Sequence, residues 1–192
     1  MTSSKLIQEN NKRIMEIDTP YNPITGEGAP LERKLIEIVD YYLPKQYVPV
    51  QMLEEKLIKA IIKAGSIIQF LKDLGEDINI DNRRLVGDTI IGLRNTYDFF
   101  YWAASFAKIK NKEGGGNIPF VLNRPQRRLI LRLEKMRLAG KPIRLILLKA
   151  RQWGGSTAIQ IYMAWIQLVH REGWDSAIVA QDNSSAIRIK EM

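Results

Sequence analysis

The order of an apolar run, a glycine loop and a second apolar pattern, late in the chain, most constrains its fold. Residues 143-IRLILLKA-150 are nearly all apolar and of strand length, as in a β-strand that is covered on both faces. The loop 149-KARQWGGST-157 follows, and residues 156–172 then carry few charges over the length of a helix. Residues 174-WDSAIVAQ-181 have the character of a second buried strand. Strand, loop, helix and strand in this order predict a βαβ unit of a parallel sheet.

The loop has the composition of a phosphate-binding turn. Gly154 and Gly155 let backbone N–H groups approach an anion closely, and the following helix adds free N–H groups and a positive dipole end. The hydroxyl of Ser156 or Thr157 can bind Mg²⁺. The P-loop consensus has a Lys directly before these hydroxyls, whereas this chain has Gly155. A tight turn before a capped helix, without a ligand, is the alternative interpretation.

Polar and basic side chains near the loop are candidate nucleotide contacts. Lys149 and Arg151 can supply the cation that a P-loop directs at the β- and γ-phosphates, and Gln152 can orient a phosphate or a water. Upstream, the amide of Gln126 can donate to and accept from an adenine edge. A solvent-exposed helix glutamine is the alternative at that position. We expect Trp153 and Trp165 to pack rather than stack on a base, and His170 to stand at a helix end.

The positive charge of the chain is concentrated in its second half. The net charge is +8, but residues 1–95 contain 13 Lys and Arg against 14 Asp and Glu. Residues 96–192 contain 16 against 7. This asymmetry favours a polyanionic partner, nucleotide or nucleic acid, over the alternative of a solvated basic face. The chain lacks cysteine, which excludes disulfides and fits a cytosolic protein. It also lacks an apolar run long enough to span a bilayer.

The first half predicts helices joined by short turns. Residues 1–30 are polar or rich in Pro and Gly and predict a loose arm. Residues 31–95 predict a helical region, because apolar residues recur at helical spacing. The helices expected in it cover residues 31–43, 50–65, 66–75 and 81–95, with Gly65 and Ser66 as caps. These apolar stripes form a core or, alternatively, a face that docks a partner.

The third region covers residues 96–192. Its first part is predicted to form a helix, a loop and a second helix that precede the βαβ unit. Residues 97–107 form an aromatic helix pattern, and 108–122 predict two short extended pieces around three glycines. A basic amphipathic helix is predicted over 123–138, with Asn123 as its cap, Pro125 in its first turn and Gly140 at its end. Its basic stripe comprises Arg127, Arg128, Arg132 and Arg137. Another helix starts in 183–192. The predicted fold class is therefore α/β.

Taken together, these motifs resemble the large terminase subunit of tailed bacteriophages, the ATP-driven motor that packages DNA. The resemblance runs from about Tyr97 to Met192 and rests on KIKNKEGGGNIPFVLNRPQRRLI, LILLKARQWGGST and DSAIVAQDNSSAIRI. It implies a helical N-terminal region followed by the start of a P-loop core of the ASCE or RecA-like type, with helices on both sides of a parallel sheet. It also implies that ATP and Mg²⁺ are the cofactors.

The resemblance assigns roles to residues of the loop. Gln126 matches the glutamine of the family's adenine-binding motif, and KARQWGGST matches its variant Walker A. Arg151 and Gln152 match the loop Arg-Gln pair, so Arg151 is the candidate for the γ-phosphate or its transition state. Lys149 would take the place of the P-loop lysine. Nucleotide contacts also include Gly154, Gly155, Ser156 and Thr157, of which Ser156 and Thr157 would reach the metal.

The family pattern also sets what we expect the chain to lack. No apolar run after the loop ends in the Asp and Glu of a Walker B motif, and the acidic cluster of the family's nuclease domain is not found. We therefore expect the front part of a longer motor protein, with little ATPase or nuclease activity of its own. The implied partners are double-stranded DNA, the small terminase subunit and the portal protein, in the cytoplasm of an infected or lysogenic bacterial cell. Self-association through an unpaired sheet edge is a further expectation.

Two other interpretations fit the same residues. One is a helicase-like P-loop ATPase with the same order of elements. The other is a basic helical module that binds DNA or protein and merely retains a βα turn.

Overall fold

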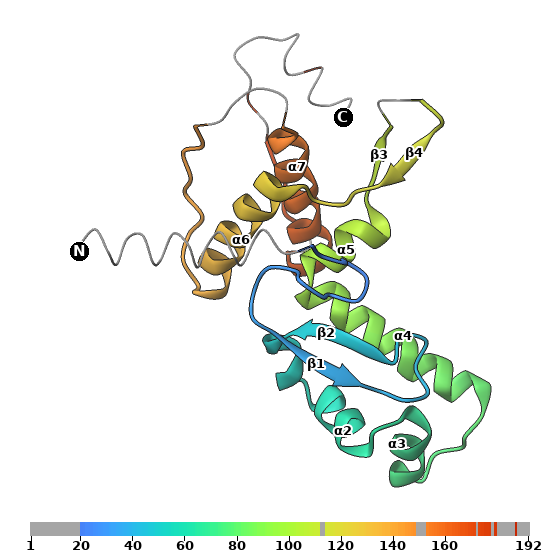
Figure 1. Ribbon diagram of the computed structural model, residues 1–192. Coiled ribbons are helices and arrows are strands. Elements are labelled where there is room, and N and C mark those ends of the chain that lie inside the picture. The colour runs from blue at the N-terminus through green and yellow to red at the C-terminus, as the bar shows by residue number, and fades with distance from the viewer. Residues whose placement is uncertain are drawn as a thin grey trace. The chain divides into compact units, whose positions relative to one another are not determined.

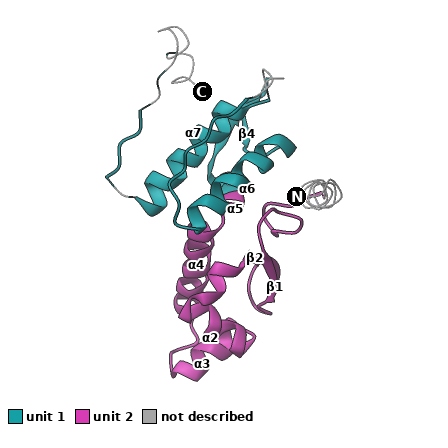
Figure 2. Ribbon diagram, turned by 90° about the vertical axis from the view of Figure 1, so that its left-hand side faces the viewer, with its two compact units in different colours: residues 1–18, 103–192 teal, residues 19–102 magenta. Residues whose placement is uncertain are grey.

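The computed structural model describes residues 20–111, 114–148, 153–171, 173–177, 179 and 187 (Figure 1). The chain divides into two compact units, shown in different colours in Figure 2. Unit 2 is Thr19–Trp102, and unit 1 is Ala103–Met192 together with Met1–Asp18. None of the helices within the described residues is long and apolar enough to cross a membrane. The helices and strands of those residues form a mixed fold with two small antiparallel sheets.

Unit 2 starts with a β-hairpin where we predicted a helix. β1 (Arg33–Glu37) pairs antiparallel with β2 (Lys45–Pro49). The predicted helix over 31–43 is therefore wrong. Ile36 and Ile38 are both buried while the residues between and before them are exposed, which is the two-residue period of a strand. The β-branched side chains at these positions also favour a strand, and a partner strand follows at once.

The helices that follow confirm the other predictions for this half of the chain. A 3₁₀ helix, η1 (Val50–Glu54), precedes α2 (Lys56–Ala64), so the predicted helix over 50–65 is interrupted at its first turn. The remaining helices are α3 (Ile67–Leu74) and α4 (Ile80–Tyr97). Gly65 ends α2 in the left-handed conformation, and the Ser66 side chain accepts from Gln69 N at 3.0 Å at the start of α3.

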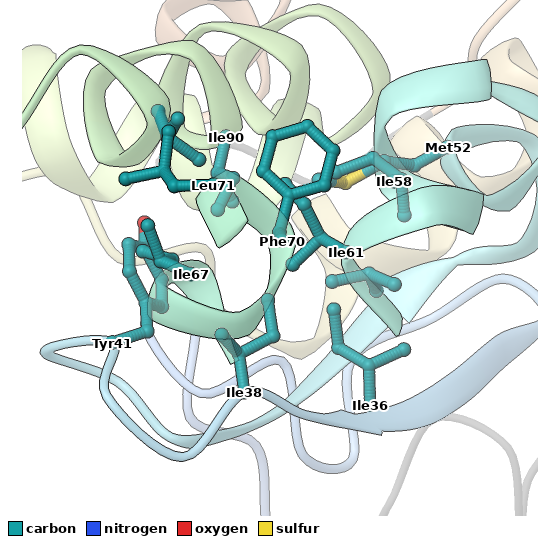
Figure 3. Close-up of a cluster of buried hydrophobic side chains, with 12 residues drawn as sticks. Ile36, Ile38, Tyr41, Met52, Ile58, Ile61, Ile67, Phe70, Leu71 and Ile90 are labelled. Carbon is teal, nitrogen blue, oxygen red and sulfur yellow. The ribbon is translucent and has the colours of Figure 1, made fainter. Parts of the chain in front are cut away.

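The core of unit 2 lies between the hairpin and the three helices (Figure 3). It is a single cluster to which every element of the unit from β1 to α4 contributes. Its members are Ile36, Ile38, Tyr41, Val48, Met52, Ile58, Ile61, Ile67, Phe70, Leu71, Val86 and Ile90. The apolar stripes of α2 and α3 therefore form a core, as we predicted, because each faces the hairpin or another helix.

A buried group of charges adjoins the C-terminal end of α4. Arg33 donates to both carboxylate oxygens of Asp98, at 2.6 and 2.8 Å, and Arg94 Nε lies 3.5 Å from the same carboxylate. The side chains of all three residues are almost inaccessible to solvent. Burial alone would raise the pKa of Asp98, but the positive charges of Arg33 and Arg94 outweigh it and hold that pKa below its ordinary value.

Unit 1 contains a hairpin and two longer helices. α5 (Phe99–Phe106) crosses from unit 2 into unit 1 and confirms the aromatic helix pattern. β3 (Lys108–Lys110) pairs antiparallel with β4 (Asn117–Pro119), as predicted for the two extended pieces. The helices are α6 (Arg124–Leu138) and α7 (Gly155–Trp165), and a π-helical segment, η2 (Ile166–His170), extends α7.

The predicted buried strands of unit 1 differ from the structure. Residues 143–148 form neither helix nor strand, and Ile146 and Leu148 are more than nine-tenths exposed. The prediction of a strand covered on both faces is wrong for them, because β1 to β4 pair only with each other and leave this run without a neighbouring strand. Residues 174–177 likewise have no regular structure. The helix predicted over 183–192 lies, apart from Ile187, outside the described residues.

Candidate functional site

Helices α6 and α7 lie side by side and run in the same direction. Side-chain contacts between them include those of Gln126 with Gly154, Glu134 with Tyr162, and Arg137 with Trp165. The partners in each contact are 28 positions apart in sequence, so the two helices keep the same register along their length. Because both run the same way, the chain between them must return from the end of α6 to the start of α7 (Figure 1).

The candidate loop is held by the first turn of α6. Asn123 and Gln126 form a capping box, in which Asn123 Oδ1 accepts from Gln126 N at 3.1 Å and Gln126 Oε1 accepts from Asn123 N at 2.9 Å. The side-chain NH₂ groups of the same two residues donate hydrogen bonds to the backbone of the loop. Asn123 Nδ2 donates to Trp153 O at 3.1 Å, and Gln126 Nε2 donates to Gly154 O at 3.0 Å. The starts of both helices are therefore fastened together.

Both glycines of the loop occupy positions where a side chain would clash. Gly154 has a φ of 76°, and a Cβ there would lie 2.6 Å from Gln126 Nε2. A Cβ on Gly155 would lie 2.7 Å from the ring of Trp153. The close approach of Gln126 and Trp153 is thus sufficient to explain both glycines, whether or not an anion binds.

The candidate site residues divide into three groups. Ser156 and Thr157 lie in the first turn of α7 and are half-buried, and their binding of Mg²⁺ stays a prediction. Gln126 is only 4% exposed, so its interpretation as a solvent-exposed helix residue is wrong. Its contact with adenine stays a prediction, as do the roles of Lys149, Arg151 and Gln152, which lie outside the described residues.

The start of α7 lacks a feature that α6 has. Gly154, the N-cap of α7, has no side chain to accept from the first-turn amides, and no side-chain cap is present. In contrast, Asn123 caps α6. Because the N-cap residue of α7 is a glycine, a bound anion has room to accept hydrogen bonds from the first-turn amides in place of a capping side chain.

A cleft of about 640 Å³ adjoins the loop, which is within the range of roughly 300–1,000 Å³ that is common for pockets that bind small ligands. This cleft lies between α6 and residues 141–148, which return the chain toward α7 and are called the return segment here. Trp153 lies at the end of the cleft nearest the loop. Two exposed guanidinium groups, of Arg128 and Arg132, stand on its α6 wall, and the opposite wall is apolar. The complete lining is Pro125, Arg128, Leu129, Arg132, Leu145, Leu147, Leu148 and Trp153.

A second set of polar contacts fixes the helices further along. Glu134 is 1% exposed, and its carboxylate accepts from Arg137 at 2.7 and 2.8 Å and from the Tyr162 hydroxyl at 2.6 Å. Burial, then the charge of Glu134, raises the pKa of Tyr162 above its ordinary value. Burial alone would lower the pKa of Arg137, but the hydrogen bonds and charge of Glu134 raise it.

The basic stripe predicted on α6 is not a uniform surface. Arg128 and Arg132 are exposed, but Arg127 is buried and Arg137 is bound to Glu134. Trp165 is fully buried, which confirms the prediction that it packs. His170 ends η2, as expected for a helix-end residue. Among the residues that the structure describes, no group of three His, Asp or Glu side chains is placed to hold a metal ion.

Comparison with known proteins does not identify the chain. No protein-family model matches it, and no curated protein or solved structure gives a significant match.

Proposed function

We propose that unit 1 binds a nucleoside triphosphate at the loop before α7, as part of a DNA-packaging ATPase of the large-terminase type. The observation that carries the proposal is the start of α7: an uncapped helix that begins at Gly154, with two hydroxyl residues in its first turn. The candidate cations Lys149 and Arg151 precede it in sequence. Phosphate would accept from the first-turn amides, and Ser156 or Thr157 would hold Mg²⁺.

The parallel arrangement of α6 and α7 supports a parallel sheet core. Helices on one face of such a sheet run in the same direction, and a strand returns the chain between them. α6 has 15 residues and is therefore about 22 Å long, a distance that about seven extended residues span. The apolar run 143–148 lies in the return segment but forms no strand, so it is the shared direction of the two helices, and not this run, that supports the proposal.

Gln126 has a positioning role in this proposal. Its amide fixes Gly154 O and caps α6 at the same time, so it sets the distance between the loop and the first helix. The exposed guanidinium groups of Arg128 and Arg132 stand beside the loop in the 640 Å³ cleft, where an anionic ligand would meet positive charge. Double-stranded DNA as the substrate of the complete motor belongs to the same proposal.

Calorimetric titration of the full chain with Mg²⁺-ATP and Mg²⁺-ADP tests the proposal. We expect binding below millimolar concentration, at least tenfold weaker binding for Arg151→Ala and for Lys149→Ala, and a loss of the Mg²⁺ dependence for Thr157→Val. Lys108→Ala is the matched control, because it removes an exposed lysine of the same unit, far along the chain from the loop.

Two results contradict the proposal. One is the absence of binding by folded wild-type protein at several millimolar nucleotide. The other is binding that Arg151→Ala and Lys149→Ala weaken no more than Lys108→Ala does. Either result would favour the basic module that binds nucleic acid or protein without a nucleotide.

A further inference from the structure

A second cleft opens at the other end of the α6–α7 pair. It has a volume of about 700 Å³ and lies where α6 ends and η2 follows α7, so the length of α6, about 22 Å, separates it from the loop. Residues of the return segment and of the stretch after η2 complete it. Its lining is Arg137, Gly140, Lys141, Pro142, Ile143, Ile166, His170, Arg171 and Trp174.

The described lining of this cleft is basic. Arg137, Lys141 and Arg171 contribute three cations, and none of the lining residues that the structure describes is a carboxylate. The charge of Arg137 is already bound by Glu134, which keeps that side chain in place. Lys141 and Arg171 are exposed at the rim, and neither forms an ion pair within the described residues. The two rim cations are therefore available to an anion from solvent.

An exposed aromatic ring, that of Trp174, is among the residues that line the cleft. Trp174 is 60% exposed, although tryptophan is usually among the more buried residues. Its backbone is fixed at both polar atoms: Trp174 N donates to Arg171 O at 3.2 Å, and Gln167 Nε2 donates to Trp174 O. The Arg171 guanidinium lies 4.9 Å from the centre of the indole ring. The ring is thus held at the cleft while most of its surface stays accessible.

We propose that this cleft binds single-stranded nucleic acid, with a base stacked on Trp174 and the neighbouring phosphates held by Lys141 and Arg171. Proteins that bind single strands combine an aromatic stacking surface with cations that follow the backbone. A duplex fits the arrangement less well, because its bases are already stacked inside the helix. A strand can continue past the site in both directions, since both cations stand at the open rim. The proposal is independent of nucleotide binding at the loop.

Fluorescence anisotropy of a labelled 12-nucleotide oligo(dT) with the full chain, in nucleotide-free buffer, tests this site. We expect Trp174→Ala to weaken binding by roughly 5- to 100-fold, because one stacked base contributes that much, and Trp174→Phe to restore most of it. Lys141→Ala and Arg171→Ala should each weaken binding. Each should also make the negative slope of the logarithm of the association constant against the logarithm of salt concentration shallower by about 0.7. An oligo(rU) of equal length shows whether the site distinguishes RNA from DNA.

The controls separate this site from general attraction to a basic protein. Lys108→Ala and Lys110→Ala each remove one exposed positive charge elsewhere in unit 1 and should change the affinity less than Lys141→Ala does. The proposal is overturned if Trp174→Ala binds oligo(dT) as wild type does, if the two control variants weaken binding as much as Lys141→Ala, or if a matched duplex binds as tightly and with the same Trp174 dependence. Circular dichroism confirms that each variant is folded.

Discussion

The two units hold themselves together in different ways. Unit 2 encloses one apolar cluster and, next to it, a carboxylate between two arginines. Unit 1 also buries apolar side chains of α6 and α7 and links the two helices by polar contacts, but it leaves the apolar run 143–148 largely exposed. An apolar run is buried only when the fold supplies a surface for it, as the hairpin of unit 2 does for its helices. Unit 2 should therefore be sensitive to loss of a buried charge, and unit 1 to loss of a single contact.

The largest effect is expected at the buried carboxylate of unit 2. Asp98→Asn should lower the free energy of unfolding by about 3–5 kcal/mol, because Arg33 and Arg94 would remain buried without their counter-charge. Urea unfolding followed by circular dichroism measures the change, and hydrogen exchange of the α4 amides assigns it to unit 2. Asp88→Asn is the control. Asp88 pairs with Arg84 on the surface at 3.7 Å, so its loss should cost less than about 1 kcal/mol.

The acid response of unit 2 should follow from the same carboxylate. The folded-state pKa of Asp98 lies below its ordinary value of 3.8, so its contribution is present above pH 3.8 and is lost as pH falls through the folded pKa. Stability against urea should therefore drop steeply below pH 3.8 in the wild type and less steeply in Asp98→Asn. Equal pH dependence of the two proteins would show that Asp98 is not the group responsible. The part of the unfolding free energy that is lost when Asp98 is protonated should be no larger than the part that Asp98→Asn removes at neutral pH.

In unit 1 the largest effect is expected at the loop. Gly154→Ala should destabilise the protein by about 2–4 kcal/mol, because a left-handed alanine costs about 1–2 kcal/mol and its Cβ would meet Gln126 at 2.6 Å. Gly140→Ala is the matched control. Gly140 also has a positive φ, of 64°, but no atom lies within 4 Å of its added Cβ, so only the conformational cost of about 1–2 kcal/mol remains. Equal effects of the two variants would show that the Gln126 contact does not constrain the loop.

The smallest effect is expected at the second contact between α6 and α7. Tyr162→Phe removes the 2.6 Å hydrogen bond to Glu134 but leaves that carboxylate bound to Arg137, so we expect a loss of about 1–1.5 kcal/mol. Tyr47→Phe removes a hydroxyl from a half-buried tyrosine of unit 2 and should change stability by less than about 0.5 kcal/mol. Thermal unfolding of the two variants, compared with wild type, gives both values.

Local signals in the sequence predicted much of the structure. Ser66 and Asn123 begin helices as expected, and Gly65 ends one, because each makes its contact within a few residues. The glycine-centred hairpin of β3 and β4 is equally local. The pattern over 31–43 misled us, since its apolar residues fit both a helix and a strand, and the partner strand β2 decides between them.

The site depended on contacts that the sequence does not display. The capping role of Gln126 follows the spacing of a capping box, but its link to Gly154 joins residues 28 positions apart, and no spacing rule predicts it. We did not single out Glu134 from the sequence, the one acidic residue of α6, which is buried and accepts hydrogen bonds from Arg137 and Tyr162. The one available signal was its spacing of three residues from Arg137, which allows an ion pair within a helix. The exposure of Trp174 had no sequence signal.

The constant offset between α6 and α7 determines where the chain tolerates changes in length. A deletion inside α7 between Gly154 and Tyr162 would turn every later side chain by about 100° around the helix and move Tyr162 away from Glu134. A residue added or removed in 141–148 leaves the contacts of Gln126, Glu134 and Arg137 with α7 in register, because this segment forms none of them. Insertions between homologues, or a small peptide tag, should therefore be accommodated in the return segment and excluded from the helices that it joins.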